Sequence, residues 1–185
     1  GLELAADLPF KSDINDAGID AVVKQIASSG AQMVFNHGST GIYEKIIRKA
    51  REQQLTTQFY GVNSGSTQLA RHLGPLAHNM IFAQVMPSPW ERKTAITRAY
   101  QEAFKAYKPK EDFSYGSLEG YMTARALVEA LRRAGPNPTR DSFVAGLKDA
   151  DLQIDGLKVN YRNGIHSGLS LVDLAIVTRE GKFRH

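Results

Sequence analysis

The chain has 185 residues, of which 42% are hydrophobic and 23% are charged. This is the composition of an ordinary globular protein, and it excludes a disordered or fibrous one. The formal net charge is only +4, and the basic residues form isolated pairs rather than the dense patch of a nucleic-acid-binding protein. No cysteine is present, which excludes disulfides, thiolate metal sites and cysteine nucleophiles. No apolar run reaches the roughly 20 residues that a membrane-spanning helix needs.

Short apolar runs alternate with amphipathic segments over residues 1–85. This alternation predicts βαβ units on a parallel sheet, which is an α/β fold. The expected strands are Leu2–Leu8, Gln32–Phe35, Gln58–Val62 and Met80–Val85. Between them we expect one helix that ends at Gly30, one with Ile42, Ile46, Ile47 and Ala50 on its buried face and Ser39 or Thr40 as its N-cap, and a short one through Leu69 and Leu73.

Polar turns follow the second and third expected strands, at Asn36–Gly41 and Asn63–Ser66. Open α/β sheets bind ligands in the crevice at the carboxyl ends of their strands. We therefore expect the two turns to lie side by side and to supply ligand contacts. Each turn could instead be an ordinary helix cap, and composition alone does not favour ligand contact over capping.

The first turn also permits an enzyme or a ligand-sensing domain that uses residues 36–41, because His37 lies close to Ser39. Residues two apart rarely direct a nucleophile and a base at each other, and the Gly-x-Ser-x-Gly elbow is absent. We therefore expect no catalytic residue. The other internal histidines lack the spacing of metal ligands, so neither a metal nor a cofactor is expected; they are His72, His78 and His166.

The second half of the chain is mainly helical. Two prolines in Met86–Trp90 interrupt the strand pattern and predict a hinge. Periodicity then predicts helices at Lys93–Tyr107, Ser117–Ala134 and Thr139–Ala150, strands at Leu157–Tyr161 and Leu171–Val177, and a hairpin turn at residues 179–182. The central helix should turn Leu118, Tyr121, Met122, Leu127, Val128 and Leu131 inward. These helices either pack on a second sheet formed by strands outside this sequence, or share the one sheet in a compact domain.

Several segments together resemble the C-terminal half of the type I periplasmic binding proteins, the branched-chain amino-acid receptor family of ABC transporters. The resemblance rests on the order and spacing of Ala31–Phe35, Gln58–Gly61, Ser114–Pro136, Val172–Val177 and Gly181–Phe183. It implies two doubly wound lobes that close on a small ligand. Residues 1–85 would then belong to the second lobe, 86–91 to a hinge, 92–161 to a helical segment of the first lobe, and 162–185 to the return into the second lobe.

The same resemblance implies a solute-binding component without enzymatic activity. Its partners would be a small amino acid, organic acid or aromatic acid and the membrane permease of an ABC transporter. Its location would be periplasmic or extracellular, after export with a signal peptide that is absent from this chain. The central helix would lack its sheet here, so Leu118, Met122 and Leu131 should form an exposed apolar patch that favours self-association.

The resemblance also suggests which residues contact the ligand. Amino-acid receptors of the family place an aromatic residue after the second strand of this lobe and an acidic residue after the third; Ser39 and Asn63 occupy those positions. Asn63 cannot neutralise a buried ammonium group, whose burial without a counter-ion would cost several kcal/mol, roughly. We therefore expect neutral or anionic groups to be bound by Gly38, Ser39, Thr40, Asn63 and Ser64. Tyr115 is expected to stack on the apolar part of the ligand, although packing is its default role.

Overall fold

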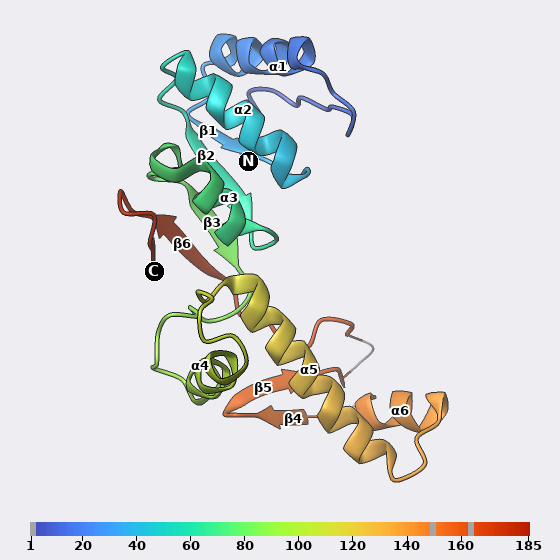
Figure 1. Ribbon diagram of the computed structural model, residues 1–185. Coiled ribbons are helices and arrows are strands. Elements are labelled where there is room, and N and C mark those ends of the chain that lie inside the picture. Colours follow the sequence, from blue (N-terminus) through green and yellow to red (C-terminus); the bar gives the residue numbers. More distant parts are fainter. Residues whose placement is uncertain (1–2, 149–150, 163–164) are drawn as a thin grey trace. The chain divides into compact units, whose positions relative to one another are not determined.

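The computed structural model describes residues 3–148, 151–162 and 165–185. The chain divides into two compact units (Figure 1). Unit 1 contains Gly1–Gln84 and Leu174–His185, and unit 2 contains Val85–Asp173. The chain leaves unit 1 after Gln84 and returns to it at Leu174. The lobe boundaries expected from the sequence stay a prediction. The assignment of the two units to two receptor lobes stays a prediction.

Unit 1 is built on a five-stranded sheet in the order β1-β2-β3-β6-β7. Its strands are β1 (Met33–Phe35), β2 (Gln58–Val62), β3 (Ile81–Gln84), β6 (Asp173–Val177) and β7 (Phe183–Arg184). The first three pair in parallel, with Met33 opposite Gln58 and Tyr60 opposite Ile81, whereas β6 and β7 form an antiparallel hairpin. This confirms the expected α/β class and its parallel strands.

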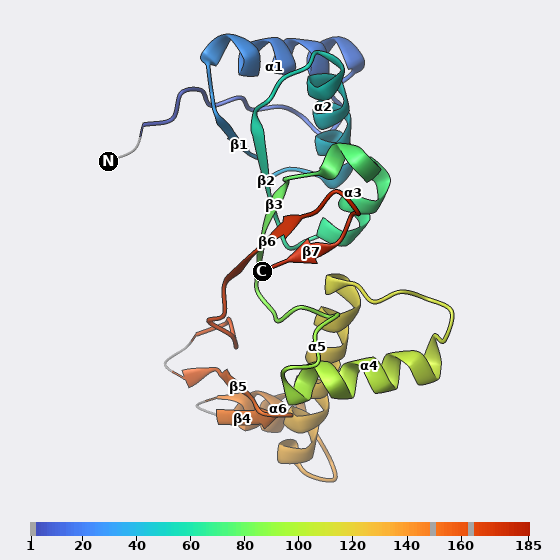
Figure 2. The same cartoon turned by 90° about the vertical axis from the view of Figure 1, so that its left-hand side faces the viewer.

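The helices of unit 1 pack on one face of this sheet (Figure 2). They are α1 (Asp16–Ser29), α2 (Thr40–Glu52), α3 (Ser66–Leu73) and the short 3-10 helix η1 (Gly74–Ala77). Their buried side chains form one core with Phe59 of β2 and Phe82 of β3. On the other face, Met33 and Phe35 are each 62% exposed.

The helix boundaries follow from their caps. Asn15 caps α1 by accepting a hydrogen bond from the Gly18 amide, and Gly30 ends that helix in the left-handed conformation that glycine adopts without strain. Ser39, rather than Thr40, is the N-cap of α2, because its side chain accepts a hydrogen bond from the Ile42 amide. The expected buried positions of α1 are confirmed: Ile19, Val22, Val23 and Ile26.

The strand expected at Leu2–Leu8 is wrong for the described part of that segment. Residue 2 lies outside the described residues, and residues 3–8 form no strand. Leu8 and Phe10 instead pack, partly buried, against the core of unit 1. Pro9 between them has no amide hydrogen for a ladder bond. The apolar residues of this segment therefore reflect contact with the core rather than strand pairing.

Unit 2 contains three helices and a β-hairpin. The helices are α4 (Ala95–Tyr107), α5 (Tyr115–Ala134) and α6 (Arg140–Leu147), and the hairpin is formed by β4 (Asp151–Ile154) and β5 (Leu157–Asn160). Helix α5 contacts α4, α6 and β4. The third helix was expected to reach Ala150; it ends at Leu147, and residues 149–150 lie outside the described part. Strand β4 was not predicted.

The apolar face of α5 is divided between buried and exposed residues. Leu118 is fully buried and Met122 is 8% exposed, so the expectation that these two side chains are left uncovered is wrong. Leu127, Val128 and Leu131 are between 41% and 48% exposed, so the expectation that they point inward is wrong for this chain. The amino-terminal half of α5 thus has packing partners in unit 2, and the carboxyl-terminal half presents an apolar surface.

Within the described residues, no helix is both long and apolar enough to cross a lipid bilayer.

Candidate functional site

The two polar loops that follow β1 and β2 lie against each other, as the sequence predicted. Gly65 has a positive φ of 72°, and a Cβ at this position would lie 2.6 Å from Cγ2 of Thr40. The loops at residues 36–41 and 63–66 therefore touch at the carboxyl ends of two adjacent parallel strands. This edge is where an open α/β sheet can hold a ligand.

The first loop is held by a helix cap and by local hydrogen bonds. Oγ of Ser39 accepts the Ile42 amide at 3.4 Å, and the side-chain amide of Asn36 donates to the Gly38 carbonyl at 3.3 Å. Ser39 and Thr40 are exposed. Since a hydroxyl can accept and donate at once, Ser39 can cap the helix and still donate its hydrogen to a ligand. Capping and ligand contact are thus compatible.

The second loop leads into the amino end of α3. The Asn63 carbonyl accepts the Ser66 amide at 3.0 Å. Asn63 is half-buried and Ser64 is exposed. Gly65 occupies the N-cap position of α3 in the left-handed conformation, which brings the backbone of this loop close to Thr40.

Gln84, at the end of β3, forms a hydrogen bond with the last residue of the second loop. It is fully buried, and its side-chain amide donates to Oγ of the buried Ser66 at 3.3 Å. Sequence reasoning missed this residue. The available signal was one polar side chain inside the apolar run from Met80 to Val85.

The two loops contain no acidic residue. The five candidates in them, Gly38, Ser39, Thr40, Asn63 and Ser64, offer only hydroxyls, an amide and backbone groups. Such a set can hydrogen-bond neutral polar groups or carboxylate oxygens, and the adjacent helix amino end of α2 favours negative charge. It supplies no counter-ion for an ammonium group.

Tyr115 is a buried residue of unit 2. Its exposed fraction is 0%, and its ring meets the Trp90 ring edge-on with the centroids 5.4 Å apart. Burial, with the nearby charge of Asp173, raises the pKa of its hydroxyl, and a hydrogen bond with Ser88 opposes that rise. The structure gives this ring a packing role within its unit, and its stacking on a ligand stays a prediction.

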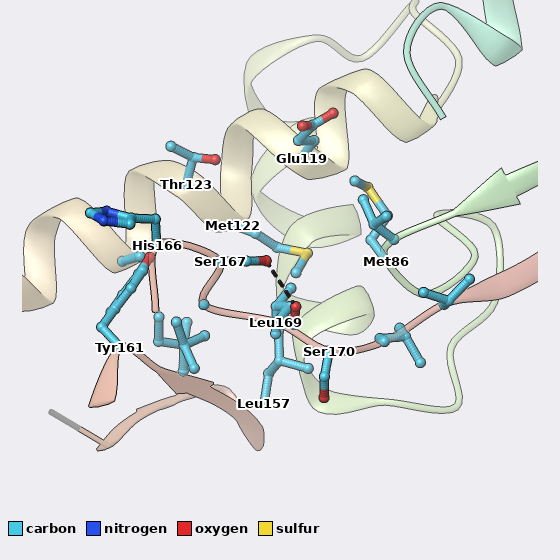
Figure 3. Close-up of a pocket in the computed structure, with 17 residues that line it drawn as sticks. Met86, Glu119, Met122, Thr123, Leu157, Tyr161, His166, Ser167, Leu169 and Ser170 are labelled. Atoms are coloured by element: carbon cyan, nitrogen blue, oxygen red, sulfur yellow. Dashed lines mark hydrogen bonds between the residues drawn. The ribbon is translucent and has the colours of Figure 1, made fainter. Parts of the chain in front are cut away.

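Unit 2 contains a cavity of about 530 Å³ (Figure 3). Met86, Met122, Leu157 and Leu169 belong to its mainly apolar wall, and Glu119, Thr123 and His166 supply polar groups. Oγ of Ser167 donates to the Leu169 carbonyl at 3.1 Å, so this hydroxyl is engaged within the wall. The cavity was not predicted from the sequence.

The residues described by the structure include no group of three or more His, Asp or Glu side chains that could hold a metal ion.

A family model with the description "periplasmic binding protein" matches residues 4–167. A search of curated proteins finds no match.

Solved structures share this fold. An extracellular ligand-binding receptor from Verminephrobacter eiseniae is 24% identical with a TM-score of 0.79, and the match covers 92% of this chain and 49% of that chain. A possible leucine/isoleucine/valine-binding protein from Rhodopirellula baltica is 26% identical with a TM-score of 0.78 over 88% of this chain and 46% of its own. An ABC-transporter solute-binding protein from R. palustris, in complex with benzoate, is 17% identical with a TM-score of 0.75, and the match covers 91% of this chain and 46% of that chain. The chain thus spans about half the length of these proteins.

Proposed function

The chain belongs to the periplasmic binding protein family, and we propose that it supplies one half of a solute-binding protein that captures a small ligand between two lobes. The loops after β1 and β2 would form its share of the ligand site. The observation that carries this proposal is the contact between Gly65 and Thr40, which joins two polar loops at the sheet edge where ligands bind.

The chemistry of these loops favours an organic or aromatic carboxylate over a standard α-amino acid. Hydroxyls at Ser39, Thr40 and Ser64 and the amide of Asn63 suit carboxylate oxygens, and no acidic residue of these loops can pair with an ammonium group. The R. palustris protein in complex with benzoate is a relative that holds an aromatic acid. A ligand without an amino group is therefore our proposal for this chain.

Unit 2 would complete its core with polypeptide outside this sequence. The support is the apolar cavity beside α5 together with the exposed side chains of Leu127, Val128 and Leu131. The solved relatives are about twice as long as this chain, so their other half is the natural source of such a segment. On this proposal, the whole protein binds its ligand well, and the chain alone binds it poorly because it offers half of the contacts.

The complete protein would act outside the cytoplasmic membrane and deliver its ligand to the permease of an ABC transporter. The support is the family itself and the ABC-transporter relative with benzoate. Such a role involves binding without chemical turnover, so we propose no catalytic residue and no cofactor.

The test uses two substitutions of Asn63 in the whole protein expressed from its own gene. Isothermal titration would compare L-leucine with isocaproate, which is leucine without its amino group. Asn63→Ala should weaken isocaproate binding, because a hydrogen-bonding amide is lost. Asn63→Asp should weaken it further through repulsion between carboxylates, and should raise the affinity for leucine.

The control is Asn137→Asp, which makes the same change of charge at an exposed turn of unit 2. It should leave both affinities unchanged. Unaltered isocaproate binding by Asn63→Ala would remove Asn63 from the site. An unchanged ratio of the two affinities in Asn63→Asp would contradict the proposed role of the missing charge.

A further inference from the structure

Tyr43 joins the ends of the two strands that carry the candidate loops. It lies in the first turns of α2, and its side chain is almost fully buried, with 2% exposed. Its hydroxyl is 2.7 Å from the Tyr60 carbonyl of β2 and 3.3 Å from the Val34 carbonyl of β1. Both carbonyls lie just before the points where the chain leaves the sheet for the two loops.

The Tyr60 carbonyl accepts two hydrogen bonds, of which the one from Tyr43 is the first. It also accepts the amide of Asn36, the first residue of the first loop, at 3.4 Å. The hydroxyl has one hydrogen, so its main bond is the shorter one to Tyr60, and Val34 receives a weaker share. One carbonyl oxygen of β2 is therefore bonded both to the start of the first loop and to the helix that follows that loop.

The ring and the hydroxyl of Tyr43 make separable contributions. The ring packs edge-on against Phe59, with 6.0 Å between the centroids, and a phenylalanine ring would fill the same space. The hydroxyl is a polar group in an apolar core, where it is tolerated only because it is hydrogen-bonded. Burial raises the pKa of this hydroxyl, so it stays protonated and remains a donor.

We propose that Tyr43 is a positioning residue of the ligand site, whose hydroxyl fixes the distance between the loops at residues 36–41 and 63–66. It would touch no ligand itself. It would hold Ser39 and Thr40, at the start of its own helix, in register with Asn63. This inference rests on the proposed function for its effect on ligand binding, but its effect on the loops can be measured without a ligand.

The test is Tyr43→Phe, compared with Tyr100→Phe as the matched control. Tyr100 is also buried, with 1% exposed, and its hydroxyl lies 2.6 Å from Oγ of Ser117 in unit 2. Each variant removes one buried hydroxyl and keeps the ring. Amide hydrogen exchange of the 185-residue chain, followed residue by residue by NMR, would report on the amides of Asn36 and Ser66.

We expect Tyr43→Phe to speed exchange at Asn36 and Ser66 by up to about tenfold, the equivalent of one hydrogen bond. Tyr100→Phe should leave both amides unchanged. In the whole protein, Tyr43→Phe should weaken isocaproate binding by a similar factor, and Tyr100→Phe should not.

Three results would overturn the inference. The loop amides could exchange at the wild-type rate in Tyr43→Phe, both variants could speed them equally, or isocaproate could bind Tyr43→Phe as tightly as the wild type. Faster loop exchange in Tyr43→Phe, together with no isocaproate binding by the wild type, would support the hold of Tyr43 on the loops and exclude isocaproate as the ligand instead.

Discussion

The contact between the two candidate loops predicts a specific cost for an alanine at Gly65. Gly65 and Gly30 both have positive φ, 72° and 65°, so alanine at either position incurs the left-handed penalty of about 1 kcal/mol. At Gly30 nothing lies within 4 Å of the added Cβ, whereas at Gly65 it would lie 2.6 Å from Cγ2 of Thr40. Thr40 is exposed and can turn away, and holding its side chain off the staggered position to relieve the clash costs about 1 kcal/mol.

Gly65→Ala should therefore lower the free energy of unfolding by about 1 kcal/mol more than Gly30→Ala does. Thr40→Ser removes the clashing methyl group, so in that background the excess should fall to near zero. Urea denaturation followed by circular dichroism would compare Gly65→Ala and Gly30→Ala with the wild type, and would compare the Thr40→Ser, Gly65→Ala double variant with Thr40→Ser. Equal costs for Gly65→Ala and Gly30→Ala, or an excess that survives Thr40→Ser, would refute the contact between the loops.

Two further predictions concern the core of unit 2 and the surface of α2. Leu118→Ala should lower the free energy of unfolding of this chain by about 2–5 kcal/mol, because Leu118 is fully buried. Leu131 is 41% exposed, so Leu131→Ala should cost less than about 1 kcal/mol in this chain and more in the whole protein, as urea denaturation of both proteins would show. An equal cost of Leu131→Ala in the two proteins would contradict a segment that covers Leu131. Hydrogen bonds from Arg48, with a smaller contribution from His72, lower the pKa of the Glu44 carboxyl. The ionised carboxylate therefore stabilises the fold fully above the ordinary glutamate pKa, and this stabilisation is lost as the pH falls through the lowered value. Glu44→Gln should flatten this part of the pH dependence of unfolding, and an unchanged profile would remove the carboxylate as its source.

The contact between the two candidate loops was predictable because it follows from local rules. A strand that ends in a polar turn and continues into a helix places that turn at the edge of the sheet, and three such units in parallel bring neighbouring turns together. Ser39 and Asn63 were chosen as candidates in this way, and their contact with a ligand stays a prediction. The cap of α2 could be read from the sequence, and only the choice between Ser39 and Thr40 required the structure. Helix α3 instead has Gly65 at its N-cap, without a side-chain hydrogen bond.

The buried supports of the site could not be predicted, because their function depends on contacts across the fold. Tyr43 is buried on α2 although the expected apolar face of that helix did not include it, and no pattern indicates the carbonyls that its hydroxyl meets. Gln84 lies within an apolar strand, and only the structure shows its bond to Ser66. Likewise, periodicity identified the apolar face of α5 without revealing what covers each part of it.

The expected first strand shows a related limit. An apolar run predicts burial, whereas a strand also needs a neighbour with free backbone groups. The segment around Leu8 and Phe10 finds its burial against the core of unit 1 without pairing. Short strands such as β4, with four residues, are equally hard to predict, since they carry too few positions for a pattern.

The most direct test of the account is a titration of the whole protein with isocaproate and with L-leucine under the same conditions. We expect saturable binding without turnover, with isocaproate bound more tightly because the loops after β1 and β2 offer no partner for an ammonium group. Tighter binding of leucine, or conversion of either compound to a product, would contradict it.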